Sequence, residues 1–158
     1  MTIIEQLESI IGQYQAGYLV LVDPDRIKLK EIPRFAQLAQ SAGVDGILLG
    51  GSFLTNDLST IAETLKKSTD LPIILFPGSA MQVTPHADAI LFMSLLSGRN
   101  ANYLIGEQVK AAPMIQRVGL ETISTGYILI DGGQQTAVSF ISNTTPIPND
   151  KAEIAWAH

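Results

Sequence analysis

Short apolar runs recur along the chain and predict strands that are buried on both faces. The first three runs end at proline, glycine or acidic residues, which interrupt a strand. The predicted strands cover residues 18–22, 45–49, 72–76 and 89–92.

Segments with apolar residues at helical spacing accompany these runs. Thr2 is placed to cap the first helix at its N-terminus, and Gly43 is placed to end the second. Pro113 is expected to kink or break the fourth helix. The helices are predicted over residues 2–13, 31–42, 56–67 and 102–118, and the inward face of the second is expected to hold Ile32, Phe35, Leu38, Ala39 and Ala42.

Two parts of the chain depart from this alternation. Residues 78–88 are too few for an ordinary crossover helix, so we expect a short irregular connection there. The run 127–131, a pair of glycines and the run 136–141 predict a β-hairpin with a tight turn. Asp150 is expected to cap a last helix.

Alternating strands and helices predict an α/β fold with a parallel sheet and right-handed crossovers. Such a pattern is compatible with a (β/α)8 barrel of ~250 residues or with an open, doubly wound sheet. The chain offers about five core strands before His158, so as a barrel it is expected to be incomplete, with only the N-terminal portion, about strands 1–5. We treat residues 1–158 as a single domain.

Composition restricts the functions that the chain can have. With a formal net charge of −5, it is not expected to bind nucleic acid, and an anionic substrate would need a metal ion or a few local cations. It contains no cysteine, which excludes disulfides and thiol catalysis. The dinucleotide fingerprint, the P-loop and the nucleophile elbow are absent. No apolar run approaches the ~20 residues of a membrane span and no signal peptide is recognisable, so we expect a cytoplasmic protein that does not span a membrane.

Polar residues follow two consecutive predicted strands. Asp23 comes after the first and Ser52 after the second, so both are expected at the same rim of the sheet. A carboxylate and a hydroxyl suit Mg²⁺, with water and substrate phosphate completing its shell. Arg26 is placed to pair with the neighbouring acids or to face a diphosphate, and Arg99 lies at the same rim if the sheet forms a barrel. From the pattern alone, a turn and a loop without chemical function explain these residues at least as simply.

Six stretches, taken in their order and spacing, resemble the geranylgeranylglyceryl phosphate synthase family, which includes the bacterial heptaprenylglyceryl phosphate synthases. They are distributed over residues 21–130, most of the chain. They are LVDPD (21–25), GILLGGS (46–52), PIILFPG (72–78), ADAILFMSLL (87–96), NYLIG (102–106) and GYILI (126–130).

The resemblance implies a TIM-type (β/α)8 barrel in which the helix after the third strand is lost. It implies a prenyltransferase that joins a polyprenyl diphosphate to the 3-hydroxyl of sn-glycerol 1-phosphate and makes an ether-lipid precursor. It also implies that Asp23 and Ser52 hold Mg²⁺ and that Arg26, where the family usually has lysine, contacts the substrate. The intact family commonly forms homo-oligomers.

In the family, the glycerol phosphate site and its Tyr-x-Glu-x-Gly-Ser-Gly-type segment come from later strands, and this sequence lacks them. We therefore expect the chain alone to be inactive, and detectable prenyl transfer by it would refute this. Two alternatives are another phosphate-handling TIM-barrel enzyme and a non-catalytic barrel fragment that assembles with another chain. No single residue indicates the length of the prenyl chain.

Overall fold

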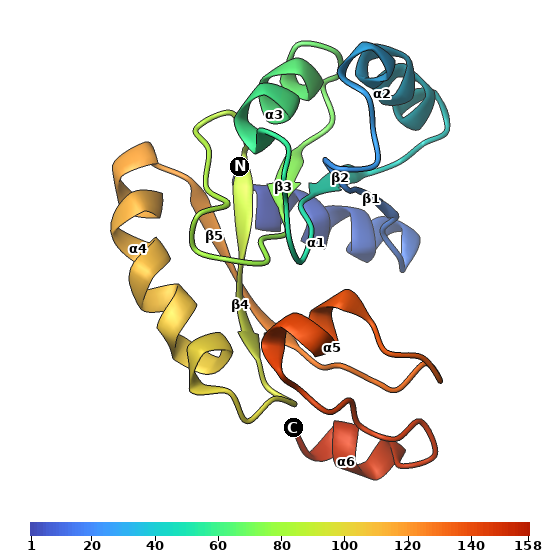
Figure 1. Cartoon of the computed structure of the whole chain (residues 1–158). Coiled ribbons are helices and arrows are strands. Elements are labelled where there is room, and N and C mark those ends of the chain that lie inside the picture. Colours follow the sequence, from blue (N-terminus) through green and yellow to red (C-terminus); the bar gives the residue numbers. More distant parts are fainter.

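The computed structural model describes residues 1–158 and contains one sheet of five parallel strands. The strands lie in the sheet in the same order as in the sequence, and each pairs with the next (Figure 1). This order confirms the predicted α/β fold with a parallel sheet. The strands are β1 (Leu19–Val22), β2 (Gly46–Leu49), β3 (Ile73–Leu75), β4 (Ala89–Leu95) and β5 (Glu121–Tyr127).

Three of the helices begin at a side chain that binds free backbone N–H groups of the first turn. The Thr2 hydroxyl accepts a hydrogen bond from Glu5, as predicted, and the Asp57 carboxylate accepts from Ser59 and Thr60. None of the helices combines the length and the apolar composition needed to cross a membrane. They are α1 (Ile3–Tyr14), α2 (Ile32–Ser41), α3 (Leu58–Lys66), α4 (Glu107–Val118), α5 (Ala137–Ser142) and α6 (Ala152–Ala157), with a 3₁₀ turn η1 (Leu29–Glu31) before α2 and a π-helix η2 (Asn102–Gly106) before α4.

The hydrophobic core lies between one face of the sheet and helices α2, α3 and α4. Ile47 and Leu49 of β2 and Ile73 and Leu75 of β3 point to this side and are fully buried. Leu38 of α2 and Ala42, its C-terminal neighbour, were predicted to face inward, but both are exposed, Leu38 by 64%. Ile32 and Ala36 of α2 belong to the core, and Phe35 packs against it.

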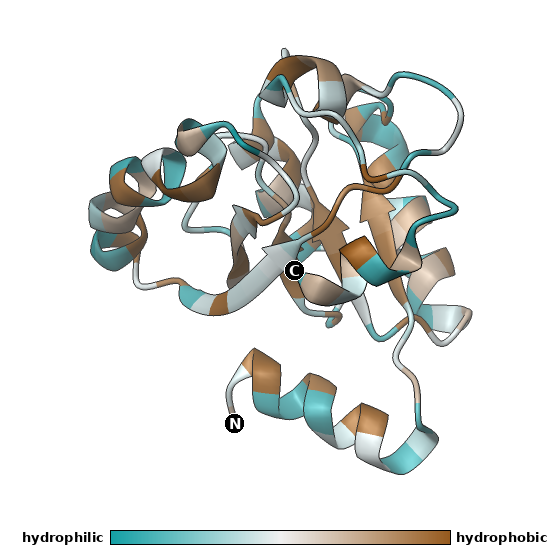
Figure 2. Cartoon of the chain, turned by 90° about the horizontal axis from the view of Figure 1, so that it is seen from below, coloured by the Kyte–Doolittle hydropathy of each residue, from teal (hydrophilic) through white to brown (hydrophobic).

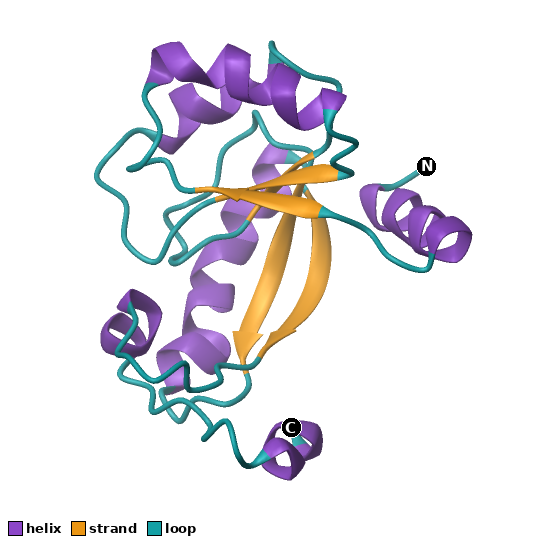
Figure 3. Cartoon of the chain, turned by 90° about the vertical axis from the view of Figure 1, so that its right-hand side faces the viewer, coloured by secondary structure: helices purple, strands orange, loops and turns teal.

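Helix α1 lies apart from this core, beneath the sheet in Figure 2 and beside it in Figure 3, and none of its residues is buried. Its N-terminus is tied to the start of β5. There the Glu121 carboxylate accepts hydrogen bonds from the backbone N–H groups of Ile3 (2.6 Å) and Ile4 (2.9 Å). A carboxylate at this position satisfies free donors and interacts favourably with the helix dipole. Glu121 therefore anchors α1 to a distant part of the sequence.

No helix separates β3 from β4, which confirms the irregular connection predicted for residues 78–88. Strand β4 was predicted to end at Phe92 but continues to Leu95. As a result, β4 and β5 are longer than the first three strands and form a curved pair that extends past them (Figure 3).

The hairpin predicted over residues 127–141 is wrong. Strand β5 ends at the beginning of this segment, and helix α5 occupies its second half. The helix begins at Thr136, whose hydroxyl accepts a hydrogen bond from the Ser139 backbone N–H while its own N–H donates to the Ser139 hydroxyl. This reciprocal cap stabilises a helical turn where the side chains alone favour a strand.

Two smaller predictions are also wrong. Helix α6 begins after Lys151, and Asp150 does not cap it. Helix α4 continues through Pro113, so the predicted break does not occur. Pro113 is exposed, and the carbonyl that loses its partner lies where water can bind it. The helix predicted over residues 102–118 is present without a break, and its first part, η2, has π-helical instead of α-helical hydrogen bonds.

Candidate functional site

The loops after β1, β2 and β3 form the rim at which the sequence predicts a site. Asp23 follows β1 directly, and its Oδ1 accepts a hydrogen bond from the Asp25 N–H (2.9 Å). Its Oδ2 lies 3.4 Å from the Nε of Arg26. The side chain remains 34% exposed, so the carboxylate is accessible to a ligand.

Asp25 holds the loop after β1 against the loop after β2. Its carboxylate accepts hydrogen bonds from the Asn56 N–H and from both the N–H and the hydroxyl of Thr55, at 2.9 to 3.1 Å. The hydrogen bond from Asn56 is the main cause of a lowered pKa at Asp25, because it stabilises the ionised form. The bonds from Thr55 add to it, and together they outweigh the opposing effect of desolvation. Asp25 is thus occupied with structural bonds, which leaves Asp23 as the carboxylate available to a ligand.

Ser52 lies on a loop whose backbone is in close contact with the loop after β3. A Cβ atom on Gly50 would lie 2.0 Å from the carbonyl oxygen of Phe76. A Cβ atom on Gly78 would lie 2.5 Å from the carbonyl oxygen of Gly51. A side chain at either position would therefore push the two loops apart, and glycine is needed at both.

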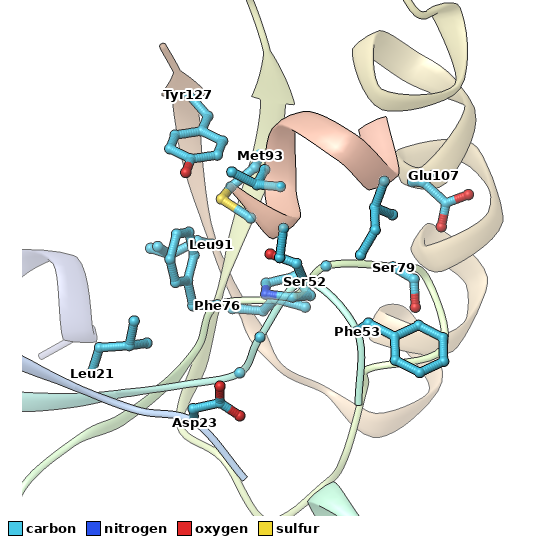
Figure 4. Close-up of a pocket in the computed structure, with 18 of the residues that line it drawn as sticks. Leu21, Asp23, Ser52, Phe53, Phe76, Ser79, Leu91, Met93, Glu107 and Tyr127 are labelled. Carbon is cyan, nitrogen blue, oxygen red and sulfur yellow. The ribbon is translucent and has the colours of Figure 1, made fainter. Parts of the chain in front are cut away.

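A pocket of about 900 Å³ opens at this rim (Figure 4). The three residues predicted for the site, Asp23, Arg26 and Ser52, all line it. Of its 33 lining residues 20 are hydrophobic, so most of the pocket suits an apolar group. The pocket therefore joins a small polar rim to a large apolar wall.

The apolar wall includes strand residues on the face of the sheet away from the core. Leu91 and Met93 are two residues apart in β4 and therefore point to the same side, into the pocket (Figure 4). The rings of Phe76 and Tyr127 meet edge to face, with centroids 5.9 Å apart. Burial raises the pKa of the Tyr127 hydroxyl, so this group is neutral at physiological pH. The wall thus carries no formal charge at these positions.

Glu107 is a pocket residue that the sequence analysis missed. Its carboxylate accepts hydrogen bonds from the Ala80 N–H (2.6 Å), the Asn102 amide (3.0 Å) and the Lys110 ammonium (2.8 Å). Desolvation opposes its ionisation, but the bonds from Lys110, Ala80 and Asn102 outweigh this and lower the pKa of Glu107. Glu107 therefore ties the irregular connection to η2 and α4.

Gln82 is a second residue that the sequence analysis missed. It lies in the irregular connection, its side chain is buried, and its amide contacts the loops after β2 and β3. No periodicity or motif within residues 78–88 distinguishes it. Only the fold shows that it lies beneath the rim.

The rim offers oxygen ligands of the kind that magnesium prefers. Asp23 offers a carboxylate and Ser52 a hydroxyl, which are both hard oxygen ligands. The Asp23 Oδ1 lies 3.4 Å from the place that a Cβ atom on Gly51 would occupy, so glycine leaves space beside the carboxylate. The chain has no group of three or more His, Cys, Asp or Glu residues that could hold a metal ion. Water and phosphate oxygens would therefore have to complete the shell, as is usual for Mg²⁺.

Arg26 and Arg99 differ in where the structure places them. Arg26 lines the pocket and pairs with Asp23, while its side chain is 87% exposed. Arg99 does not line the pocket, and its guanidinium donates to the carbonyl of Gly98. The structure thus brings Arg26 to the site and does not bring Arg99 there.

A pocket beyond the carboxyl ends of parallel strands is where α/β barrels and related folds bind their ligands. Residues 10–158, nearly the whole chain, match the PcrB family, and the chain belongs to this family.

Curated relatives with the name geranylgeranylglyceryl phosphate synthase are similar to most of the chain. The one from Chitinophaga pinensis is 51% identical over 140 residues, which cover 88% of this chain and 56% of the relative. The one from Flavobacterium johnsoniae is 40% identical over 157 residues, which cover 99% of this chain and 65% of the relative. The chain thus spans less than two thirds of the length of these relatives.

Two solved structures have the same fold. Wild-type GGGPS from Thermoplasma volcanium superposes with a TM-score of 0.90 at 31% identity, over 99% of this chain and 63% of that one. The (S)-3-O-geranylgeranylglyceryl phosphate synthase from Thermoplasma acidophilum, solved in complex with its substrate sn-glycerol-1-phosphate, gives a TM-score of 0.87 at 34% identity. These matches confirm the predicted fold class, a TIM-type barrel of which the chain contains the part with strands 1–5.

Proposed function

We propose that the chain forms the polyprenyl diphosphate-binding part of a magnesium-dependent prenyltransferase. The complete reaction joins the polyprenyl group to sn-glycerol 1-phosphate, releases diphosphate and makes an ether-lipid precursor. The observation that carries the proposal is the union, in one pocket, of a rim with metal-binding character and a long apolar wall. The names of the relatives and the ligand of the Thermoplasma acidophilum structure support the choice of reaction and of acceptor.

Each part of the pocket has a role in this proposal. Asp23 and Ser52 would hold the magnesium ion, which when bound supplies positive charge to neutralise the departing diphosphate. The backbone at Gly51 leaves room for the phosphate oxygens beside Asp23. The wall around Phe76 and Leu91 holds the prenyl tail and excludes water, which would otherwise capture the allylic carbon as it becomes cationic.

Arg26 is proposed to contact the diphosphate. Its only ion pair is with Asp23 at 3.4 Å, and its side chain is largely exposed, so turning toward a ligand would break one weak surface interaction. A guanidinium at this position would donate two hydrogen bonds to one phosphate group. The predictions of a homo-oligomer, of a cytoplasmic location and of no turnover by these 158 residues alone stay predictions.

Calorimetric titration tests the proposal. We expect the chain with magnesium to bind a long polyprenyl diphosphate more tightly than inorganic pyrophosphate, because only the former fills the apolar wall. Asp23→Asn removes a proposed ligand and is expected to weaken both by roughly tenfold or more, since losing even a hydrogen-bond partner of a metal ligand costs about 10–100-fold. Asp150→Asn, at an exposed carboxylate outside the pocket, is the matched control and is expected to change neither.

Two results would contradict the proposal. Equal affinity for the two ligands would favour another phosphate-handling barrel enzyme. Absence of binding, together with concentration-independent assembly that does not respond to magnesium, would favour a non-catalytic fragment.

A further inference from the structure

The side chain of Gln82 connects the two rim loops that follow β2 and β3. Its Nε2 donates to the carbonyl oxygen of Gly51 (2.9 Å), and its Oε1 accepts from the N–H of Gly78 (3.0 Å). Both ends of the amide are therefore used. The residue is only 7% exposed, so water has little access to replace either bond.

These two bonds lie where the loops approach each other most closely. A Cβ atom on Gly78 would lie 2.5 Å from the Gly51 carbonyl oxygen and 2.7 Å from that of Ser52. The peptide that links Gly51 to Ser52 is thus in contact with Gly78 and bound by the Gln82 amide. Its position determines where the Ser52 hydroxyl lies.

We propose that Gln82 is a positioning residue, which places Gly51 and the Ser52 hydroxyl so that they can bind a magnesium-bound diphosphate. The inference rests on the proposed function of this site. It also gives a role to the irregular connection. Between β3 and β4, where a regular barrel has a helix packed on the sheet, this chain has a loop instead. This loop places the buried amide of Gln82 against the neighbouring loop that follows β2.

The central test compares Gln82→Met with Thr84→Val. Methionine keeps the length of the side chain and removes both polar groups of the amide. Thr84 belongs to the same connection, is 1% exposed, and hydrogen-bonds the Ser59 hydroxyl (2.9 Å) without contacting Gly51. Thr84 also accepts a hydrogen bond from the His86 N–H (3.3 Å), so each variant removes two partly buried hydrogen bonds. Both variants are therefore expected to lower the midpoint of urea unfolding by similar amounts.

Ligand binding separates positioning from general stability. We expect Gln82→Met to weaken the binding of magnesium with inorganic pyrophosphate by about tenfold, as for other supports of metal ligands. It should also speed hydrogen–deuterium exchange of the amides at residues 51–53. Thr84→Val should bind within about twofold of the wild type, with unchanged exchange at these amides.

Three outcomes overturn the inference or the function beneath it. Equal binding by Gln82→Met and the wild type would overturn the role of Gln82. Wild-type binding by Gln82→Glu would also do so, because this variant keeps the acceptor for Gly78 and loses the donor to Gly51. If the wild-type chain does not bind magnesium pyrophosphate, the proposed function fails, and unchanged exchange at residues 51–53 in Gln82→Met would then overturn the positioning role separately.

Discussion

Strands β1 to β3 and strands β4 to β5 differ in how the rest of the chain covers them. The second and third strands are almost completely buried beneath α2 and α3, whereas β5 alternates between half-buried and exposed side chains along its whole length. The residues of the polar rim follow β1 and β2, whereas β4 contributes Leu91 and Met93 to the apolar pocket wall and β5 contributes Tyr127. The half with β1 to β3, the closed half, thus positions the Asp23 carboxylate and the Ser52 hydroxyl, while the half with β4 and β5, the open half, adds apolar surface for a long tail.

The largest expected effect distinguishes the two halves by their packing. Ile73 in β3 is fully buried, so Ile73→Ala is expected to lower the free energy of unfolding by about 2–5 kcal/mol. Ile123 in β5 is half-buried, so Ile123→Ala is expected to lower it by less than half as much. Urea unfolding of both variants measures the difference. Equal losses would show that the two halves are equally well packed.

A smaller effect concerns the tie between β5 and α1. Glu121→Gln removes the charge at the N-terminus of α1 and weakens the paired bonds to Ile3 and Ile4. We expect a loss of about 1 kcal/mol in unfolding free energy and faster hydrogen exchange in residues 3–14. Glu8→Gln, at an exposed position of the same helix, is the control and should leave this exchange unchanged. Unchanged exchange in Glu121→Gln would mean that α1 is held by other contacts.

The smallest expected effect is the pH dependence of stability that arises from Asp25, in the loop after β1. The pKa of Asp25 is lower in the folded chain than in the unfolded chain. Its contribution to stability is therefore present above the ordinary carboxyl pKa and is lost as the pH falls through the lower folded value. Asp25→Asn should be less stable than the wild type at pH 7, with the difference narrowing toward pH 3 in urea unfolding. A difference that stays constant with pH would show that the charge of Asp25 does not matter.

The sequence predicted the strands and helices of the closed half because its local patterns agree with one another. Apolar runs end at residues that stop strands, and the caps of α1 and α3 lie where such residues are common. The same reasoning wrongly predicted a β-hairpin over residues 127–141. Val138 and Ile141 favour a strand, but the reciprocal bonds of Thr136 and Ser139 start a helix, and the extended stretch before it pairs through Ile130 with Ile147.

Part of the candidate site was predicted because some of its residues directly follow strands that the sequence pattern reveals. Asp23, Arg26 and Ser52 follow strands, and the family resemblance gave roles to them. Gln82 and Glu107 were not predicted, because each binds backbone groups of another loop. Nearly every residue has the same backbone N–H and carbonyl groups. A hydrogen bond to these groups therefore cannot be predicted from the residue types of the loop that is bound.

The bond between Glu121 and the start of α1 also affects the order in which the chain can fold on the ribosome. Each strand pairs with the one before it, so the sheet is able to grow as the chain emerges. Helix α1 is made first, but its anchor is synthesised 118 residues after Ile3. At synthesis rates of about 5–20 residues per second this delay is roughly 6–24 s, during which the apolar side of the nascent helix is open to chaperones.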